Sequence, residues 1–152
     1  MEVIVSINLL RQKALLSVSK VLDIIFNNAD FDFNNKLDIV KFRVKSEKGI
    51  IEKCEKKNLE FENCYDLIGI RFILKSDSDC YELCHLLTKI NMFEFIEVRD
   101  YIKNPQMPNN YQALHVLIKY NNLPCELQIL STRMYKESKG KHDNYKKVKG
   151  SN

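Results

Sequence analysis

The segment from Asp66 to Leu74, DLIGIRFIL, constrains the fold more than any other part of the sequence. Its nearly continuous apolar run, rich in isoleucine, predicts a central strand that is buried on both faces. Arg71 interrupts this run, and a guanidinium inside such a strand needs a partner, either an internal carboxylate or a ligand phosphate. Asp66 stands where a loop enters the strand, so its carboxylate either reaches a metal ion that bridges phosphates or satisfies the backbone donors of a turn.

The rest of the chain alternates between helical and strand patterns, with neither an internal repeat nor a low-complexity linker. We therefore expect one α+β domain over residues 1–152, in which a mixed sheet of about five strands is flanked by helices. An N-terminal helix over 7–29, with Ser6 as its N-cap and Leu15 on its inner face, precedes a core at about 38–146. Further helices are expected from Ser46 to about 58, from 77 or 78 to about 90, and from 132 onward. The other strands are expected at 38–45, 93–102, 113–120 and 124–130, the last two joined by a turn at Asn121 and Asn122.

Charge and cysteine content are those of an ordinary soluble protein. Lys and Arg outnumber Asp and Glu by 24 to 20, a mild excess that fits a phosphate-bearing ligand without requiring one. Charges interrupt the apolar N-terminal region, which also lacks the features of a signal peptide, so neither a membrane span nor secretion is expected. The five cysteines contain no C-x-x-C pair and predict free thiols in a reducing cytoplasm. Cys80, Cys84 and His85 could suggest zinc, but both cysteines fall on the apolar stripe of a helix, which favours core packing.

The strand expected at 38–45 carries a basic face. Val40, Phe42 and Val44 alternate with Lys41, Arg43 and Lys45, so the two sets point to opposite sides. A fork-shaped guanidinium beside a flexible ammonium suits a polyphosphate, and Lys53 on the next helix could extend the patch. The alternative is a solvated edge strand, on which Lys and Arg are common.

Two further segments combine polar and aromatic groups. Glu126 and Gln128 share one face of the last strand, and a carboxylate and an amide there suit metal binding or proton abstraction, or simply a solvent-facing side. The loop DYIKNPQMPNNYQALH is rich in Asn and Pro and contains Tyr111 and His115. An aromatic ring on such a loop either stacks on a nucleobase or plugs the core.

Six motifs, taken in order, resemble the synthetase domain of the RelA/SpoT family, which makes the alarmones ppGpp and pppGpp. They are RVKS (43–46), DLIGIRF (66–72), RDYIKNPQ (99–106), YQALH (111–115), ELQI (126–129) and H-x-x-YK (142–146). The resemblance extends from about 42 to 146 and implies a nucleotidyltransferase-like fold. It also implies a GTP/GDP pyrophosphokinase that transfers pyrophosphate from ATP to the 3′-hydroxyl of GDP or GTP.

The family's chemistry implies a role for each matching residue. Asp66 would bind Mg²⁺, and Glu126 would act near the attacking hydroxyl as base or second metal ligand, with Gln128 beside it. On the acceptor side, Tyr111 would stack on guanine. His115 would support that pocket, and Lys103 would contact the acceptor. The ATP phosphates would be held by Arg43, Lys45, Ser46, Lys53 and Arg71.

The sequence departs from the family pattern mainly on the acceptor side. Leu130 stands where the family usually has Arg, Gln106 stands for Lys, and Asn110 stands for Gly. Gly49 replaces a common Ser near the ATP motif. Pyrophosphorylation of the tRNA 3′ end by a toxic family member is therefore an alternative, to which the lysine-rich tail at 136–149 lends some support. A nucleotide- or RNA-binding module without catalysis is a third interpretation, and the oligomeric state stays open.

Overall fold

The computed structural model describes residues 2–139, with side chains from Ser6 onward. A long helix, a short helix and the first strand come first: α1 (Glu2–Asn28), α2 (Phe33–Lys36) and β1 (Leu37–Val44). They are followed by α3 (Glu47–Lys57), a 3-10 turn η1 (Phe61–Asn63), β2 (Ile68–Leu74) and α4 (Asp77–Leu87). The last strands are β3 (Glu94–Asp100), β4 (Leu114–Tyr120) and β5 (Leu123–Ser131), and residues 132–139 are helical.

The strands form one sheet in the order β1-β2-β5-β4-β3, which confirms the mixed five-stranded sheet. Among the described strands, β2 and β5 form the one parallel pair, and the other neighbours are antiparallel. The parallel pair sets Gly69 opposite Glu126 and Arg71 opposite Gln128. Two segments far apart in the sequence therefore meet in register at the middle of the sheet.

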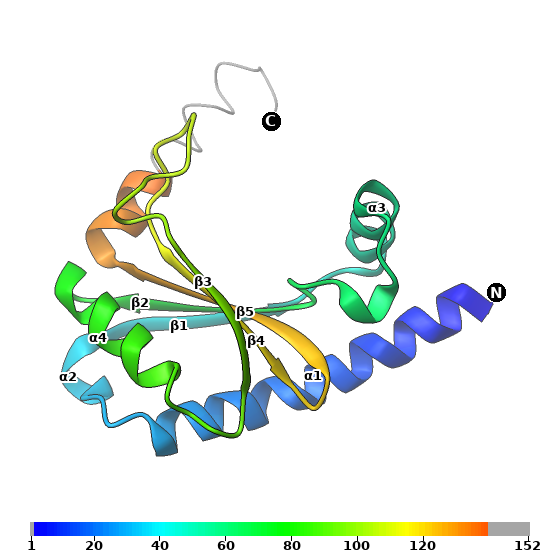
Figure 1. Cartoon of the computed structure of the whole chain (residues 1–152), viewed down its shortest axis with the longest axis horizontal. Coiled ribbons are helices and arrows are strands. Elements are labelled where there is room, and N and C mark those ends of the chain that lie inside the picture. Colours follow the sequence, from blue (N-terminus) through cyan, green and yellow to red (C-terminus); the bar gives the residue numbers. More distant parts are fainter. Residues whose placement is uncertain (1, 140–152) are drawn as a thin grey trace.

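One face of the sheet holds the main apolar core. Alternate residues of β2, β4 and β5 point into it, including Ile70, Phe72, Val116 and Leu127, all 1% exposed or less. Helices α1 and α4 cover this face, and Figure 1 shows α1 running beneath the strands. Cys80 and Cys84 lie in the core at 0% and 8% exposed, as their apolar stripe predicts. The burial of these side chains is what holds the helices to the sheet.

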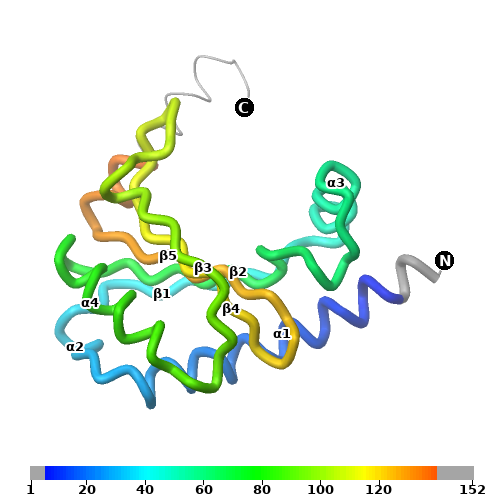
Figure 2. The backbone as a smooth tube through the Cα atoms, viewed as in Figure 1, coloured from blue at the N-terminus to red at the C-terminus, as the bar shows by residue number. Residues whose placement is uncertain are grey.

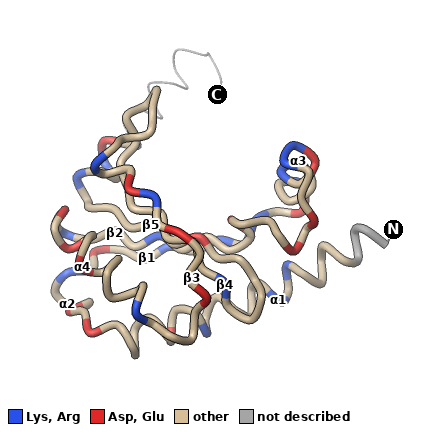
Figure 3. The backbone as a smooth tube through the Cα atoms, in the orientation of Figure 1, with Lys and Arg blue, Asp and Glu red and all other residues tan. Residues whose placement is uncertain are grey.

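The other side of the sheet carries different elements. In Figure 1, α3 and the loop between β3 and β4 rise on this side at opposite ends of the strands. Figure 2 traces the loop as a narrow excursion next to the helical segment 132–139. The central strands lie between them, and in Figure 3 a few basic and acidic positions interrupt their otherwise uncharged trace. The helices of the core thus leave the polar face free for a ligand site.

Three expectations about the edges of the fold were wrong. Helix α1 begins at Glu2, so Ser6 lies within it and is not its N-cap. Leu15 is 58% exposed because the buried stripe instead follows Ile7, Ala14, Val18 and Ile25. Phe42 is 55% exposed although Val40 and Val44 pack on the core, since β1 is an edge strand and no element among residues 2–139 covers this ring.

Helix termini follow the local sequence more closely. Ser46 caps α3 as expected, because its hydroxyl oxygen accepts a hydrogen bond from the Gly49 N–H at 3.1 Å. Asn58 ends this helix in the left-handed conformation. Helix α4 is capped by Ser76 and ends at Leu87, three residues before the expected end. None of the helices in the described part of the chain combines the length and the apolar character needed to cross a membrane.

The β4–β5 hairpin offers a test of the turn. Asn121 and Asn122 have φ of 48° and 64°, and a two-residue hairpin turn of type I′ has positive φ at both positions. We expect Asn122→Ala to lower the free energy of unfolding by about 1 kcal/mol, because alanine lacks the polar side chain that lets asparagine tolerate the left-handed conformation. Asn122→Gly should leave it equal or higher. Urea denaturation of both variants measures the difference, and equal midpoints for Ala and Gly would contradict the assigned turn.

Candidate active site

The polar face of the sheet is organised in two rows across the strands. Arg43, Gly69 and Glu126 are register partners in the first row. Lys41, Arg71, Gln128 and His115 form the second, in which each residue pairs with the next. The two-residue period of each strand keeps these side chains on the same face. The expected shared faces of β1 and of β5 are therefore confirmed.

Hydrogen bonds link the second row to Glu126. Arg71 Nε donates to Gln128 Oε1 at 2.9 Å, and Gln128 Nε2 donates to Glu126 Oε1 at 2.8 Å. His115 Nδ1 lies 3.8 Å from the same Glu126 oxygen, and its Nε2 lies 3.0 Å from the Tyr111 hydroxyl. The partner that Arg71 needed is thus an amide, and the guanidinium keeps its full positive charge for a ligand.

Asp66 is the centre of a second cluster at the start of β2. Lys45 Nζ and Lys53 Nζ each lie 3.0 Å from Asp66 Oδ2, and the Cys64 thiol donates to Oδ1 at 3.4 Å. Lys53 also lies 3.7 Å from the centroid of the Tyr65 ring. Asp66 therefore acts as an ionic partner of two lysines, rather than as a cap for turn amides.

Electrostatics keep this cluster charged. Burial raises the pKa of Asp66, but hydrogen bonds from Lys45 and Lys53 outweigh it and hold the pKa below its ordinary value. Burial lowers the pKa of Lys53, and its bonds to Tyr65 and Asp66 more than reverse that, leaving the pKa raised. Both groups are ionised at neutral pH.

His115 and Tyr111 show the opposite behaviour. Burial lowers the pKa of His115, and the nearby Arg99 and Arg71 oppose the pull of Glu126, so the imidazole is neutral at pH 7. Burial raises the pKa of the Tyr111 hydroxyl to about 12. The Tyr101 ring packs edge-on against His115 with centroids 5.1 Å apart. The pair Tyr111 and His115 is thus an uncharged aromatic wall.

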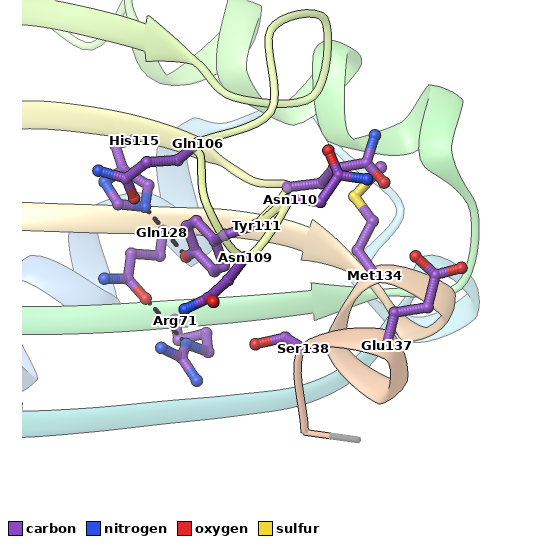
Figure 4. Close-up of a pocket in the computed structure, with 11 residues that line it drawn as sticks. Arg71, Gln106, Asn109, Asn110, Tyr111, His115, Gln128, Met134, Glu137 and Ser138 are labelled. Carbon is purple, nitrogen blue, oxygen red and sulfur yellow. Dashed lines mark hydrogen bonds between the residues drawn. The ribbon is translucent and has the colours of Figure 1, made fainter. Parts of the chain in front are cut away.

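The two larger cavities that the described residues form on the polar face share Arg71 and Gln128. The first, which we name the basic cavity, has a volume of about 360 Å³ and is lined by Lys41, Phe42, Arg43, Asp66, Gly69, Ile70, Arg71, Glu126 and Gln128. The second, the loop cavity, has a volume of about 530 Å³. Its walls are the loop residues 106 and 109–112, His115, and the helical residues Met134, Glu137 and Ser138 (Figure 4). Figure 4 shows Tyr111 reaching from the loop toward His115.

The structure brings most of the expected site residues to these cavities. Arg43, Arg71, Asp66, Glu126 and Gln128 line the basic cavity, and Tyr111 and His115 line the loop cavity. Lys45 and Lys53 are tied to the basic cavity through Asp66.

Two expected residues and one motif lie elsewhere. Ser46 uses its hydroxyl as the α3 cap. The Lys103 side chain is exposed and lines neither cavity. The backbone N–H of Lys103 donates a hydrogen bond to the Asp100 carboxylate. Their nucleotide contacts stay predictions. The H-x-x-YK motif at 142–146 lies outside the described residues.

Some residues of the cavities were not expected from the sequence. Lys41 was placed on the basic face of its strand but was not expected to contact the ligand, and Gly69 lies between Arg43 and Glu126 in the first row. A Cβ at Gly69 would meet the Arg43 side chain at 3.7 Å, so this glycine leaves room that the cavity uses. Asn109, Gln112 and Glu137 also line the loop cavity. The first two lie in the Asn- and Pro-rich loop that the sequence singled out, whereas no sequence signal marked Glu137.

A family model described as a region found in RelA/SpoT proteins matches residues 42–150. The chain belongs to the RelA/SpoT family. The GTP pyrophosphokinase YwaC of Bacillus subtilis is 33% identical over 92 residues, which cover 57% of the chain and 43% of YwaC. The chain spans less than half the length of the curated relatives that it matches.

Solved structures of small alarmone synthetases share the fold. Small alarmone synthetase 2 from Bacillus subtilis has a TM-score of 0.73 at 28% identity, over 93% of this chain and 79% of that one. Small alarmone synthetase 1 from the same organism, solved with its product pppGpp, has a TM-score of 0.71 at 22% identity, over 90% and 76%. The nucleotidyltransferase-like sheet implied by the motifs is thus the fold of this chain.

The structure shows what replaces the arginine that the RelA/SpoT pattern has at position 130. Leu130, in place of the usual Arg, is 1% exposed in a second apolar cluster with Ile73, Ala113 and Met134. Arg133, the nearest arginine, does not take its place, because it pairs with Asp77 at 2.8 Å.

Gly49 has a local role. A Cβ at this position would lie 3.1 Å from both Lys45 Cγ and Ser46 Oγ. The glycine therefore leaves room for the Lys45 side chain and for the α3 cap.

The Asp66 cluster predicts a pH-dependent stability. Because the folded pKa of Asp66 is depressed, its ion pairs stabilise the fold above the unfolded value of about 3.9, and the stabilisation is lost as pH falls through the folded pKa. We expect Asp66→Asn to be less stable than the wild type at pH 7, and the gap to shrink below about pH 4. Urea unfolding from pH 7 to pH 3 in the presence of a chelator measures this gap. A gap that stays constant with pH would contradict the ion pairs.

Proposed function

We propose that this chain transfers pyrophosphate from ATP to the 3′-hydroxyl of GDP or GTP, yielding AMP and ppGpp or pppGpp. The observation that carries the proposal is the pair of adjoining cavities, one basic and one aromatic, which share Arg71 and Gln128. Two nucleotides bound in them would meet at Glu126, which lines the basic cavity and contacts both Gln128 and His115. The name of YwaC, a GTP pyrophosphokinase, and the pppGpp bound to small alarmone synthetase 1 support the assignment.

The basic cavity suits the donor triphosphate. Transfer of a phosphoryl or pyrophosphoryl group depends mainly on positioning and on neutralising phosphate charge. Arg43 and Arg71 face this cavity without a carboxylate within ion-pair distance in the described part of the chain. Their guanidinium forks can bind two phosphate oxygens each. Lys45 and Lys53 form ion pairs with Asp66 at the edge of this cavity. If the Asp66 carboxylate bound a metal ion instead, both ammonium groups would be available to the phosphates.

A magnesium ion fits the residues of the basic cavity. Asp66 and Glu126 both line it, and hard oxygen ligands of this kind are those that Mg²⁺ prefers. The described residues hold no group of three or more His, Cys, Asp or Glu side chains suited to a metal. Phosphate oxygens and water would therefore complete the coordination, as is usual for Mg²⁺. The ion would supply neutralisation of the charge on the transferred group.

The loop cavity suits the acceptor. The neutral Tyr111 and His115 wall offers an aromatic surface for a purine, and base stacking of this kind needs no glycine cradle. Glu126 would accept the proton of the 3′-hydroxyl, and the Gln128 amide holds one of its oxygens in place. Arg71, on the shared wall, would bind the pyrophosphate as it passes between the nucleotides.

Transfer of label tests the proposed reaction. The protein is incubated with γ-labelled ATP, Mg²⁺ and, in turn, GDP, GTP and deacylated tRNA. We expect label on GDP or GTP, and Glu126→Gln should reduce the rate by about 100-fold or more while binding of ATP persists. Glu94→Gln, an exposed change on β3, is the control. Label on tRNA alone would replace the acceptor in this proposal, and nucleotide binding without any transfer would refute it.

The aromatic wall predicts a split between the two substrates. We expect Tyr111→Ala to raise KM for the guanosine acceptor by about tenfold or more, because base stacking contributes on the order of 1–3 kcal/mol per base. KM for ATP should change less than twofold, since Tyr111 lines the loop cavity and not the basic one. Tyr111→Phe removes only the hydroxyl contact with His115 and should keep most of the affinity. An equal loss toward both substrates in steady-state kinetics would contradict stacking.

A further inference from the structure

Tyr135, in the helical segment 132–139, lies close to three cations, of which Lys41 and Arg71 line the basic cavity. Lys41 Nζ donates a hydrogen bond of 2.7 Å to the Tyr135 hydroxyl and lies 5.0 Å from the ring centroid. The Arg71 guanidinium and Lys139 Nζ lie 5.9 and 5.1 Å from the same centroid. A tyrosine face attracts cations through its quadrupole, and the hydroxyl adds an acceptor. The ring therefore holds together cations that would otherwise repel one another.

The partners of these cations differ in kind from those of the other basic residues nearby. Lys45 and Lys53 share the carboxylate of Asp66, so much of their charge is compensated. Within the described residues, Lys41 and Arg71 have no carboxylate within 4.0 Å, and their partners are the Tyr135 hydroxyl and the Gln128 amide. Neutral partners fix the direction of a cation and leave its charge available to an anion.

The helix that carries Tyr135 is fastened to the sheet by contacts that do not involve the Tyr135 hydroxyl. Thr132 donates hydrogen bonds of 3.2 Å to the Leu74 carbonyl and to Asp38, and Arg133 pairs with Asp77. Met134 is buried at 1% exposed in the second apolar cluster. The helix is thus anchored to the sheet through its first turn, and the Tyr135 hydroxyl remains for Lys41.

We propose that Lys41 is a further contact for the donor phosphates and that Tyr135 is the positioning residue that holds Lys41 and Arg71 toward the basic cavity. The proposal rests on the proposed function, because it assumes that the anion in that cavity is the triphosphate of ATP. Lys41 lines the cavity beside Arg43, so the two side chains and Arg71 form a cationic rim around it. The hydrogen bond from Lys41 also lowers the pKa of Tyr135, as expected for a hydroxyl that carries partial negative charge toward an ammonium.

A double-mutant cycle on analogue binding tests this. The α,β-methylene analogue of ATP is titrated into the wild type, Lys41→Met, Tyr135→Phe and the double variant by calorimetry, with Mg²⁺ at constant ionic strength. We expect Lys41→Met to weaken binding about tenfold and Tyr135→Phe about threefold, as for loss of a charged and of a supporting hydrogen bond. The double variant should bind like Lys41→Met alone, because Tyr135 acts through Lys41.

Matched controls separate positioning from folding. Lys136→Met removes an exposed lysine from the same helix, and Tyr120→Phe removes a hydroxyl at the far end of β4; neither should change analogue affinity. In steady-state kinetics, KM for ATP should rise in Tyr135→Phe while kcat and KM for the acceptor stay within about twofold. Thermal unfolding of the variants checks that the fold is intact, and the exposed Lys41 carries the test even if Tyr135→Phe unfolds.

The outcomes are distinct for the two proposals. Unchanged analogue affinity in Lys41→Met, or additive losses in the double variant, would overturn the roles of Lys41 and Tyr135. Tight analogue binding by a wild type that transfers no label would refute the proposed reaction, and the binding cycle would still decide the roles of Lys41 and Tyr135. A wild type that does not bind the analogue would refute both.

Discussion

The parallel pairing of β2 with β5 is the interaction on which the rest of the site depends. It places Arg71 beside Gln128 and Gly69 beside Glu126, although these residues are 57 positions apart in the sequence. A parallel pair requires a crossover, and here α4, β3 and β4 make it, so the loop between β3 and β4 returns to the same face. Burial of Ile70, Phe72 and Leu127 on the opposite face fixes the register, because a slip of one residue would turn these side chains to solvent and the polar ones into the core.

The charged side chains around this pair of strands have two kinds of partner, carboxylates and neutral groups. Asp66 holds two lysines at 3.0 Å, and its own pKa stays low despite burial. Arg71 and Lys41 are held instead by an amide and a phenol. A ligand-free site with every cation paired to a carboxylate would have to break those pairs to bind phosphate. A site with unpaired cations alone would repel itself, so the mixture allows a stable fold with charge left over for an anion.

The sequence predicted features that depend on short-range periodicity. The two-residue period placed Glu126 and Gln128 on one face, and the cap at Ser46 and the turn at Asn121 follow from side chains next to the backbone that they satisfy. Partners across the sheet could not be predicted, because they depend on register between distant segments. Arg71 was known to need a partner, but an internal carboxylate or a phosphate was expected and an amide was found. The predicted burial of Leu15 and Phe42 was wrong for a related reason. Apolar residues occur on both sides of α1 and β1, and only the packing decides which side is covered.

Leu130 connects the two halves of the site in a way that its position in the motif does not suggest. Where the family usually has a charged side chain, this leucine packs with Ile73, Ala113 and Met134 and brings the helical segment 132–139 down onto the end of the sheet. Tyr111 and Tyr135 both pack against this cluster. The apolar Leu130 and the position of Tyr135 beside Lys41 therefore belong to the same packed cluster. Met134 and Tyr111 line the loop cavity, and Tyr135 contacts Lys41 and Arg71 of the basic cavity. A change in the packing of this cluster would therefore move walls of both cavities, which ties the shape of the loop cavity to the cationic rim of the basic one.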